Sequence, residues 1–164
     1  MERNRFSVAG SSSLADSSLL FVRVILAFVV AAHGAQKLLG WFGGYGFDGT
    51  IDFFTNTIGL PYFFALLIIL TESVGMLVLA IGMGSRILAA SVILIMIGAI
   101  ATLHGQFGFF MNWSGNLGGE GFEYHLLVAT LASVIVVNGS GKYSLDAYLQ
   151  ARFPGRNVLA SLYS

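Results

Sequence analysis

The sequence contains no cysteine, and only 10% of its 164 residues are charged. Without cysteine, this chain alone cannot form disulfides, thiolate nucleophiles or Cys-ligated zinc and iron–sulfur sites. Soluble domains carry roughly a quarter charged residues, whereas 56% of this chain is apolar. Its eight basic and eight acidic side chains cancel, which excludes a nucleic-acid binder with a broad basic field. The class that remains is an integral membrane protein.

Long stretches of the chain carry no charge at all, at residues 53–71, 87–119 and 124–141. A membrane span needs about 20 mostly apolar residues. Four segments meet or approach that length, at residues 19–39, 60–81, 87–104 and 123–138. We expect the first to persist as a membrane helix, because it is too long for a signal peptide and lacks a clean A-x-A exit. The predicted fold is an all-α polytopic membrane four-helix bundle.

Three regions follow from these spans: an N-terminal segment (1–18), the four-span domain (19–139) and a C-terminal tail (140–164). With four spans, both termini and the 82–86 connection share one side of the membrane. The basic residues on that side are Arg3, Arg5, Arg86, Lys142, Arg152 and Arg156, whereas the other two loops hold only Asp48, Asp52, Glu120 and Glu123. The positive-inside rule therefore predicts a plasma-membrane protein with both termini in the cytoplasm.

Two short helices are expected outside the spans. Phe47, Ile51, Phe54 and Ile58 recur at helical spacing, which predicts a short interfacial helix in the first outer loop. In the tail, Ser144 is a suitable N-cap for a helix over residues 145–152, and a Pro-Gly pair follows it.

Two charged residues lie deep within the predicted spans. An ionisable side chain near the bilayer centre costs at least about 2.5–3.5 kcal/mol, so it is expected to be paired or functional. The helical rise places Glu72 near the centre and Arg23 about 7 Å from it in depth, within reach of an arginine side chain. We therefore expect an Arg23–Glu72 ion pair, which either fixes helix register or takes part in handling protons or a ligand.

A second group of polar residues lies in the outer part of the bilayer: His33, Lys37, His104, Glu123 and His125. Histidine and lysine can hydrogen-bond the carbonyls of a quinone, and histidine or glutamate can exchange its protons. Two imidazoles could instead hold haem iron, or histidine with Glu123 a metal. Because no HExxH, CxxCH, P-loop or dinucleotide motif is present, we expect a quinone rather than haem, and no metal. The residues do not identify a catalytic group.

Several motifs, in order along residues 19–149, resemble the DoxX family of small membrane proteins. The first is R-x9-HGAQKL, from Arg23 to Leu38, followed by GGYGFDGTIDFF. The second span and its turn read ESVGMLVLAIGMGSR, from Glu72 to Arg86. H-G at His104, E-Y-H at Glu123 and GKYSLD at Gly141 complete the pattern.

The resemblance implies a four-helix bundle and a link to membrane redox metabolism. Relatives are associated with an archaeal thiosulfate:quinone oxidoreductase and with bacterial complexes that link thiol and superoxide detoxification. The sequence therefore predicts a quinone-linked subunit or accessory of an oxidoreductase, whose partners are the bilayer, redox proteins and an apolar or quinone-like ligand. An oligomer is left open. Two alternatives are a non-catalytic scaffold for partner enzymes and a small-solute or proton-coupled transporter centred on Glu72.

Overall fold

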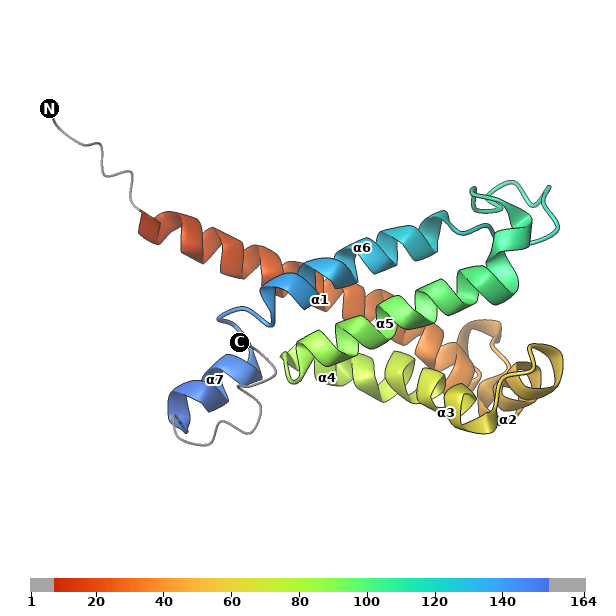
Figure 1. Cartoon of the computed structure of the whole chain (residues 1–164), viewed down its shortest axis with the longest axis horizontal. Helices are drawn as coiled ribbons and strands as arrows, with labels where there is room; N and C mark the ends of the chain where they lie inside the picture. Colours follow the sequence, from red (N-terminus) through yellow and green to blue (C-terminus); the bar gives the residue numbers. More distant parts are fainter. Residues whose placement is uncertain (1–7, 154–164) are drawn as a thin grey trace, which may run out of the picture.

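The computed structural model describes residues 8–153, and this part of the chain is helical without any strand (Figure 1). The first helix, α1, is the longest. After it come three short helical segments, a second span made of three consecutive segments, a third span, a fourth span and a short final helix. Their bounds are α1 Val8–Leu39, η1 Trp41–Gly43, α2 Gly46–Asp52, η2 Phe53–Thr57, α3 Tyr62–Leu70, η3 Thr71–Gly75, α4 Met76–Ile81, α5 Ser85–Ala99, η4 Ile100–His104, η5 Gly105–Phe107, α6 Glu123–Asn138 and α7 Leu145–Arg152.

The predicted spans are present as helices. Three are long and apolar enough to cross a membrane, at Ser13–Leu39, Tyr62–Ile81 and Ser85–Phe107. The fourth, α6, has 16 residues and is shorter than the others; at 1.5 Å per residue it extends about 24 Å. The four predicted helices form one bundle, which confirms the expected fold class.

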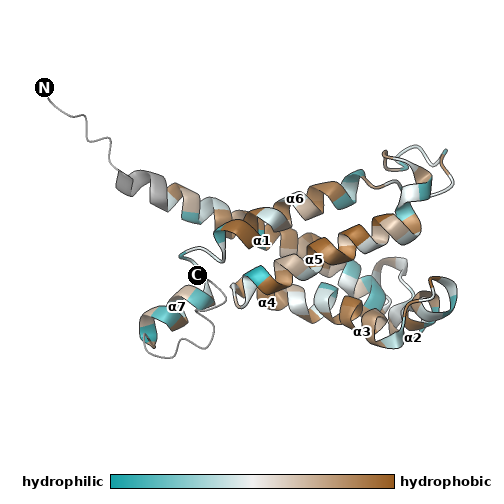
Figure 2. Ribbon diagram, viewed as in Figure 1, coloured by the Kyte–Doolittle hydropathy of each residue, from teal (hydrophilic) through white to brown (hydrophobic). Residues whose placement is uncertain are grey.

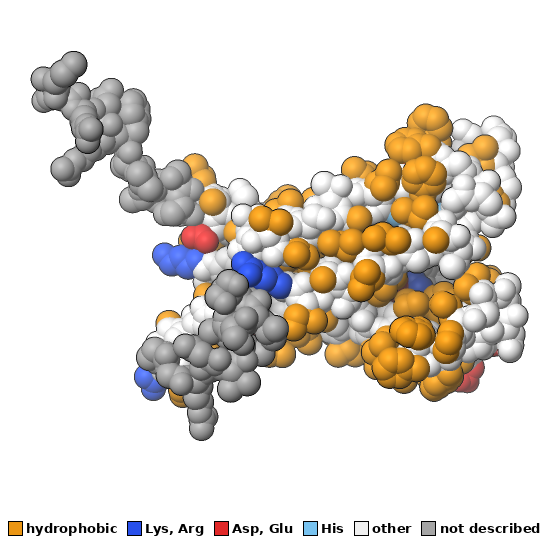
Figure 3. All heavy atoms as spheres, viewed as in Figure 1, with side chains coloured by type: hydrophobic (Ala, Val, Ile, Leu, Met, Phe, Trp, Pro, Cys, Tyr) orange, Lys and Arg blue, Asp and Glu red, His pale blue; other side chains and the backbone are white. Residues whose placement is uncertain are grey.

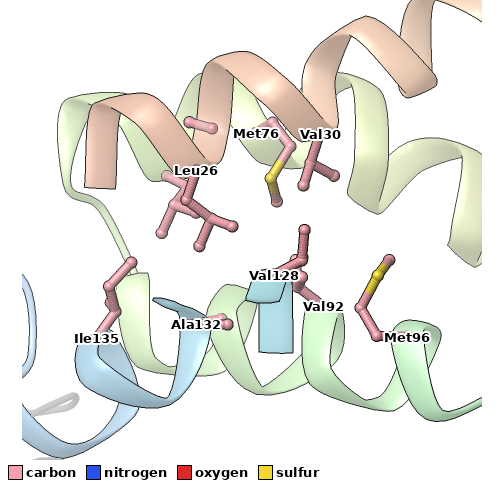
Figure 4. Close-up of a cluster of buried hydrophobic side chains, with 11 residues drawn as sticks. Leu26, Val30, Met76, Val92, Met96, Val128, Ala132 and Ile135 are labelled. Carbon is pink, nitrogen blue, oxygen red and sulfur yellow. The ribbon is translucent and has the colours of Figure 1, made fainter. Parts of the chain in front are cut away.

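Each span of the bundle contacts two neighbours. Helix α1 packs against η3 and α4 on one side and against α6 on the other, and α5 packs against α6, α4 and η3. We call the end with the α4–α5 turn and α7 the base, and the end with residues 40–59 and 105–122 the loop end (Figure 1). Side chains of all four spans meet in a continuous core nearer the base, including Leu26, Met76, Val92 and Ala132 (Figure 4).

The outer surface of the bundle is strongly apolar. Large side chains point away from every span, including Phe28 at 74% exposed, Leu77 at 66%, Leu94 at 69% and Leu127 at 66%. Figure 2 shows apolar residues along the bundle and more polar ones on α7. An apolar surface of this extent requires lipid as its solvent, so the bundle lies in contact with the bilayer.

The base is fastened by Arg23, whose side chain is fully buried. Its guanidinium donates hydrogen bonds to three backbone carbonyls, those of Ala80 at 3.3 Å, Tyr143 at 2.6 Å and Ser140. The expected Arg23–Glu72 ion pair is therefore wrong. Arg23 instead joins α1 to the end of α4 and to the segment that leads into α7.

Asp146 completes this fastening from α7. Its carboxylate accepts hydrogen bonds from Gly84 N at 3.0 Å and Ser140 Oγ at 2.7 Å, and its own amide donates to Gly82 O. Gly82 has φ of 77°, and a Cβ there would meet the Arg23 guanidinium. The glycine is thus required both by its backbone conformation and by the space that Arg23 occupies.

Both short helices expected outside the spans are present. In the first loop, α2 continues into η2, so the segment Gly46–Asp52 and the turn after it are helical as predicted. Helix α7 begins after Ser144, whose hydroxyl accepts a hydrogen bond from Ala147 N. The expected stop at Pro154 lies outside the described residues.

Candidate functional site

A cavity of about 800 Å³ occupies the loop-end half of the bundle. All four spans and the α2–η2 segment contribute to its wall, and most of that wall is apolar. Figure 3 shows the hollow between two lobes at this end, with a basic side chain inside it. Lys37 is the only lysine or arginine among the lining residues. A volume of this size is typical of sites for small organic ligands.

Three π-helical turns contribute to the cavity wall. These are η2, η3 and η4, and they supply Phe53, Thr71, Glu72, Thr102 and His104, among others. A π turn inserts an extra residue into a helix and rotates the side chains that follow, and such turns occur frequently at functional sites. Here they direct polar side chains of two apolar spans toward the same space.

The charged centre of the cavity is an ion pair between Lys37 of α1 and Glu72 of η3. The Glu72 side chain is 4% exposed and that of Lys37 is 24% exposed. Gly34 explains the pairing, because a Cβ there would overlap the backbone of Glu72, so α1 and η3 are in direct contact at this level. Lys37 is one helical turn from Gly34, whereas Arg23 is 11 residues, or about 16 Å, away along the helix.

The three histidines all line the cavity, as Lys37 does. His33 contacts the ring of Tyr124, with ring centroids 5.3 Å apart, and His104 contacts His125 with centroids 4.1 Å apart. His104 Nδ1 also lies 2.9 Å from the carbonyl oxygen of Glu120. Since a carbonyl only accepts, Nδ1 of His104 carries a proton in this contact.

Two buried polar atoms of α6 have no hydrogen-bond partner within the described chain: the hydroxyl of Tyr124 and Nδ1 of His125. His125 is only 6% exposed, and both residues line the cavity. A buried polar atom without a partner carries a free-energy cost of about 1–3 kcal/mol, which a bound molecule can offset. Both atoms belong to residues that line the cavity, and neither is satisfied within the described part of the chain.

Glu123 does not line the cavity and has a different role. Its Oε1 accepts hydrogen bonds from Met111 N at 3.0 Å and from Trp113 Nε1 at 3.3 Å. Glu120 holds the same loop, accepting from Asn112 N at 2.6 Å. The two carboxylates fix the 105–122 loop, whose Met111 and Glu120 line the cavity. The position of Glu123 therefore does not support the expectation that it binds a ligand.

Sequence reasoning places one cavity residue, Glu72, outside the site and misses another, Tyr124. Glu72 was expected beneath the site as a partner of Arg23, but it is part of the site. Sequence patterns alone do not single out Tyr124, but one signal points to it: it lies next to His125 and one turn before Val128, on a buried face of α6. A tyrosine at the end of a buried stripe requires a partner for its hydroxyl.

Comparison with known proteins identifies the family of this chain. The sequence model of the DoxX family matches residues 18–105. The chain belongs to the DoxX family. A relative from Bacillus subtilis (strain 168), named "Putative oxidoreductase CatD", is 32% identical over 141 residues, which is 86% of this chain and 93% of the relative. No solved structure gives a significant match. The DoxX match includes the cavity residues of α1, η3 and η4, while Tyr124 and His125 follow it.

Proposed function

We propose that this DoxX protein binds a quinone-class ligand in the loop-end cavity and acts as a quinone-linked subunit or accessory of a membrane oxidoreductase system. The observation that carries the proposal is the pair of unpartnered buried atoms, Tyr124 Oη and His125 Nδ1, beside the Lys37–Glu72 ion pair. The name of the Bacillus subtilis relative, "Putative oxidoreductase CatD", supports the redox part of the proposal.

A quinone suits this wall for chemical reasons. Its carbonyl oxygens accept hydrogen bonds, which Lys37 and the Tyr124 hydroxyl can donate. Its ring is flat and apolar, and Phe53, Phe54 and other apolar side chains make up most of the wall. In the quinol form the hydroxyl groups donate instead, and Glu72 and His125 Nδ1 can accept. The cavity therefore holds groups suited to both oxidation states.

We place the protein in the plasma membrane with the base toward the cytoplasm. Arg86 and Lys142 lie at the base, whereas the charged residues of the two loops at the other end are acidic. In this orientation the cavity faces the outer leaflet. A cysteine-labelling assay on whole cells tests this orientation with two variants, Ser114→Cys and Gln150→Cys. An impermeant maleimide should label the Ser114→Cys variant and not the Gln150→Cys variant. The reverse result would contradict the orientation.

Ligand binding is tested directly with the protein in lipid nanodiscs. We expect short-chain ubiquinone or naphthoquinone analogues to bind, and Tyr124→Phe to weaken binding about 2–10-fold, since a neutral hydrogen bond contributes about 0.5–1.5 kcal/mol. Tyr148→Phe is the matched control, because Tyr148 is 63% exposed on α7 and lies away from the cavity. Absence of binding for both quinone types, or equal affinity in Tyr124→Phe and wild type, would refute the proposal.

A further inference from the structure

Two stripes of side chains face the cavity from neighbouring spans. On α3 and η3 the stripe is Phe64, Leu67, Ile68 and Thr71, and on α5 and η4 it is Ser91, Leu94, Ile95, Gly98 and Thr102. Both follow helical spacing, so each stripe is one face of its helix. In a bundle these two faces would normally pack together, but here the cavity lies between them.

The two spans pack against each other nearer the base. A Cβ added to Gly75 would lie 3.3 Å from Leu88 Cδ2, so the helices approach closely there. Toward the loop end they diverge, as the ribbons of α3 and α5 show (Figure 1). The arrangement is a V whose closed end is at Gly75 and whose open end contains the cavity.

Residues on both arms of the V line the cavity and have large accessible surfaces. Phe64 is 54% exposed, Leu67 42% and Leu94 69%. Gly98 lines the cavity, and a Cβ at this position would meet nothing within 4 Å. Figure 3 shows the hollow of this cavity from the side of the bundle, so the cavity opens sideways between α3 and the η4 end of α5.

The opposite wall carries three of the polar residues of the cavity. Lys37 belongs to α1, Tyr124 and His125 belong to α6, and α1 packs against α6 across the bundle from this opening. The site is therefore polar at the back and apolar at the side opening. In a membrane, that opening meets the hydrocarbon chains of the lipid and not water.

We propose that this opening is a lateral portal, and that the ligand is an amphiphile whose head group binds at Lys37, Glu72, Tyr124 and His125 while its apolar tail passes between α3 and α5 into the bilayer. The head group rests on the function proposed above. The tail is a separate claim about substrate class: the protein selects lipid-soluble molecules with a chain over water-soluble molecules with the same ring.

The test uses two quinones with the same ring, one without a tail and one with a long isoprenoid tail, and protein in nanodiscs. Gly98→Trp should weaken binding of the tailed quinone about tenfold or more, because lost burial of even two methylenes has an effect of that size. Binding of the tailless quinone should change less than about twofold, which is within the scatter of surface substitutions. Leu94→Trp repeats the test at a side chain that is already large and exposed.

Two control variants separate obstruction from general damage. Gly98→Ala adds a methyl group to open space and should bind both quinones as wild type does. Leu127→Trp enlarges a lipid-facing residue of α6 that does not line the cavity, and should also have no effect. Equal weakening of both quinones by Gly98→Trp, or no weakening of the tailed one by either tryptophan variant, would overturn the portal.

A second measurement does not depend on the quinone. Because the chain has no cysteine, Thr71→Cys provides one spin-labelling site in the cavity. Through an open portal the label should collide with oxygen dissolved in the lipid more than with a water-soluble nickel complex, and Gly98→Trp should lower the oxygen collisions. If neither quinone binds but this result is obtained, the quinone function fails and the portal stands. Preferential collision with the nickel complex would refute the portal.

Discussion

Lys37 on α1 forms an ion pair with Glu72 in the π-helical turn η3, across the contact that Gly34 makes possible. The pair joins two spans and also forms the charged wall of the cavity. A nearly buried carboxylate is stable in this position only with its cation, since removal of one partner of a buried pair leaves an uncompensated charge. Stability and the proposed ligand binding therefore depend on the same two side chains.

Single substitutions of this pair should be more harmful than the double substitution. We expect Lys37→Met or Glu72→Gln alone to lower the stability of the protein by about 2–4 kcal/mol, and Lys37→Met with Glu72→Gln to recover part of that loss. Thermal unfolding in detergent of the four proteins measures the coupling. Asp52→Asn, an exposed carboxylate bonded to Asn56, should have little effect. Additive losses would show that the two charges do not depend on each other.

Arg23 and Glu72 should behave as independent residues. Arg23 binds backbone carbonyls at the base, so Arg23→Met should destabilise the protein strongly, while Arg23→Met and Glu72→Gln together should give the sum of the two single effects within about 0.5 kcal/mol. Folded Arg23→Met should also bind the quinone with wild-type affinity. A coupling well above that limit in the same unfolding assay would restore the ion pair that the sequence predicted.

Two glycines of the spans should respond oppositely to alanine. A methyl group at Gly34 would overlap the Glu72 backbone, so Gly34→Ala should separate α1 from η3, lower the melting temperature and weaken ligand binding. Gly98→Ala enters open space and should be neutral or more stable by up to about 1 kcal/mol, the difference in helix propensity. Melting curves and quinone titrations of both variants make the comparison. A harmless Gly34→Ala would exclude the close contact.

The loop over the cavity should loosen when Glu123 loses its charge. Glu123→Gln weakens the hydrogen bonds that hold Met111 and Trp113, so the backbone amides of residues 108–122 should exchange with deuterium faster, and the fluorescence of Trp113 should shift to longer wavelength. Trp41→Phe removes the other tryptophan, so the signal belongs to Trp113. If the same amides exchange equally fast with and without the Glu123→Gln substitution, Glu123 does not anchor the loop.

Truncation of the tail is a poor test of the scaffold alternative. A chain ending at Gly139 would lack Ser140 and Tyr143, two of the three carbonyl acceptors of Arg23, and the bundle itself would weaken. Substitution of exposed α7 residues is the suitable experiment. Tyr148→Ala with Gln150→Ala should leave unfolding and quinone binding unchanged, and loss of a partner protein in pull-down from membranes would then report docking alone.

The sequence was sufficient for the fold because membrane insertion leaves few choices. Apolar stretches of about 20 residues must become helices in lipid, where every backbone polar group needs an internal partner. The helix at α7 and its Ser144 cap also follow from local chemistry. All of these depend on residues close together along the chain.

The composition of the cavity was only partly predictable. His33, Lys37, His104 and His125 share a depth that helix rise gives directly, and all four line the cavity. Glu123 has the same depth but turns to the loop, because the direction of a side chain at a helix start depends on the loop it meets.

The sequence by itself therefore determined a cysteine-free membrane bundle and the level at which its polar residues gather. Only the tertiary structure decided which of them meet. Lys37 rather than Arg23 pairs with Glu72 because Gly34 sets the contact between α1 and η3. The π turns and the divergence of α3 from α5 created the cavity and its side opening. Contacts between distant helices depend on small residues and helix irregularities whose effect appears only when the helices pack.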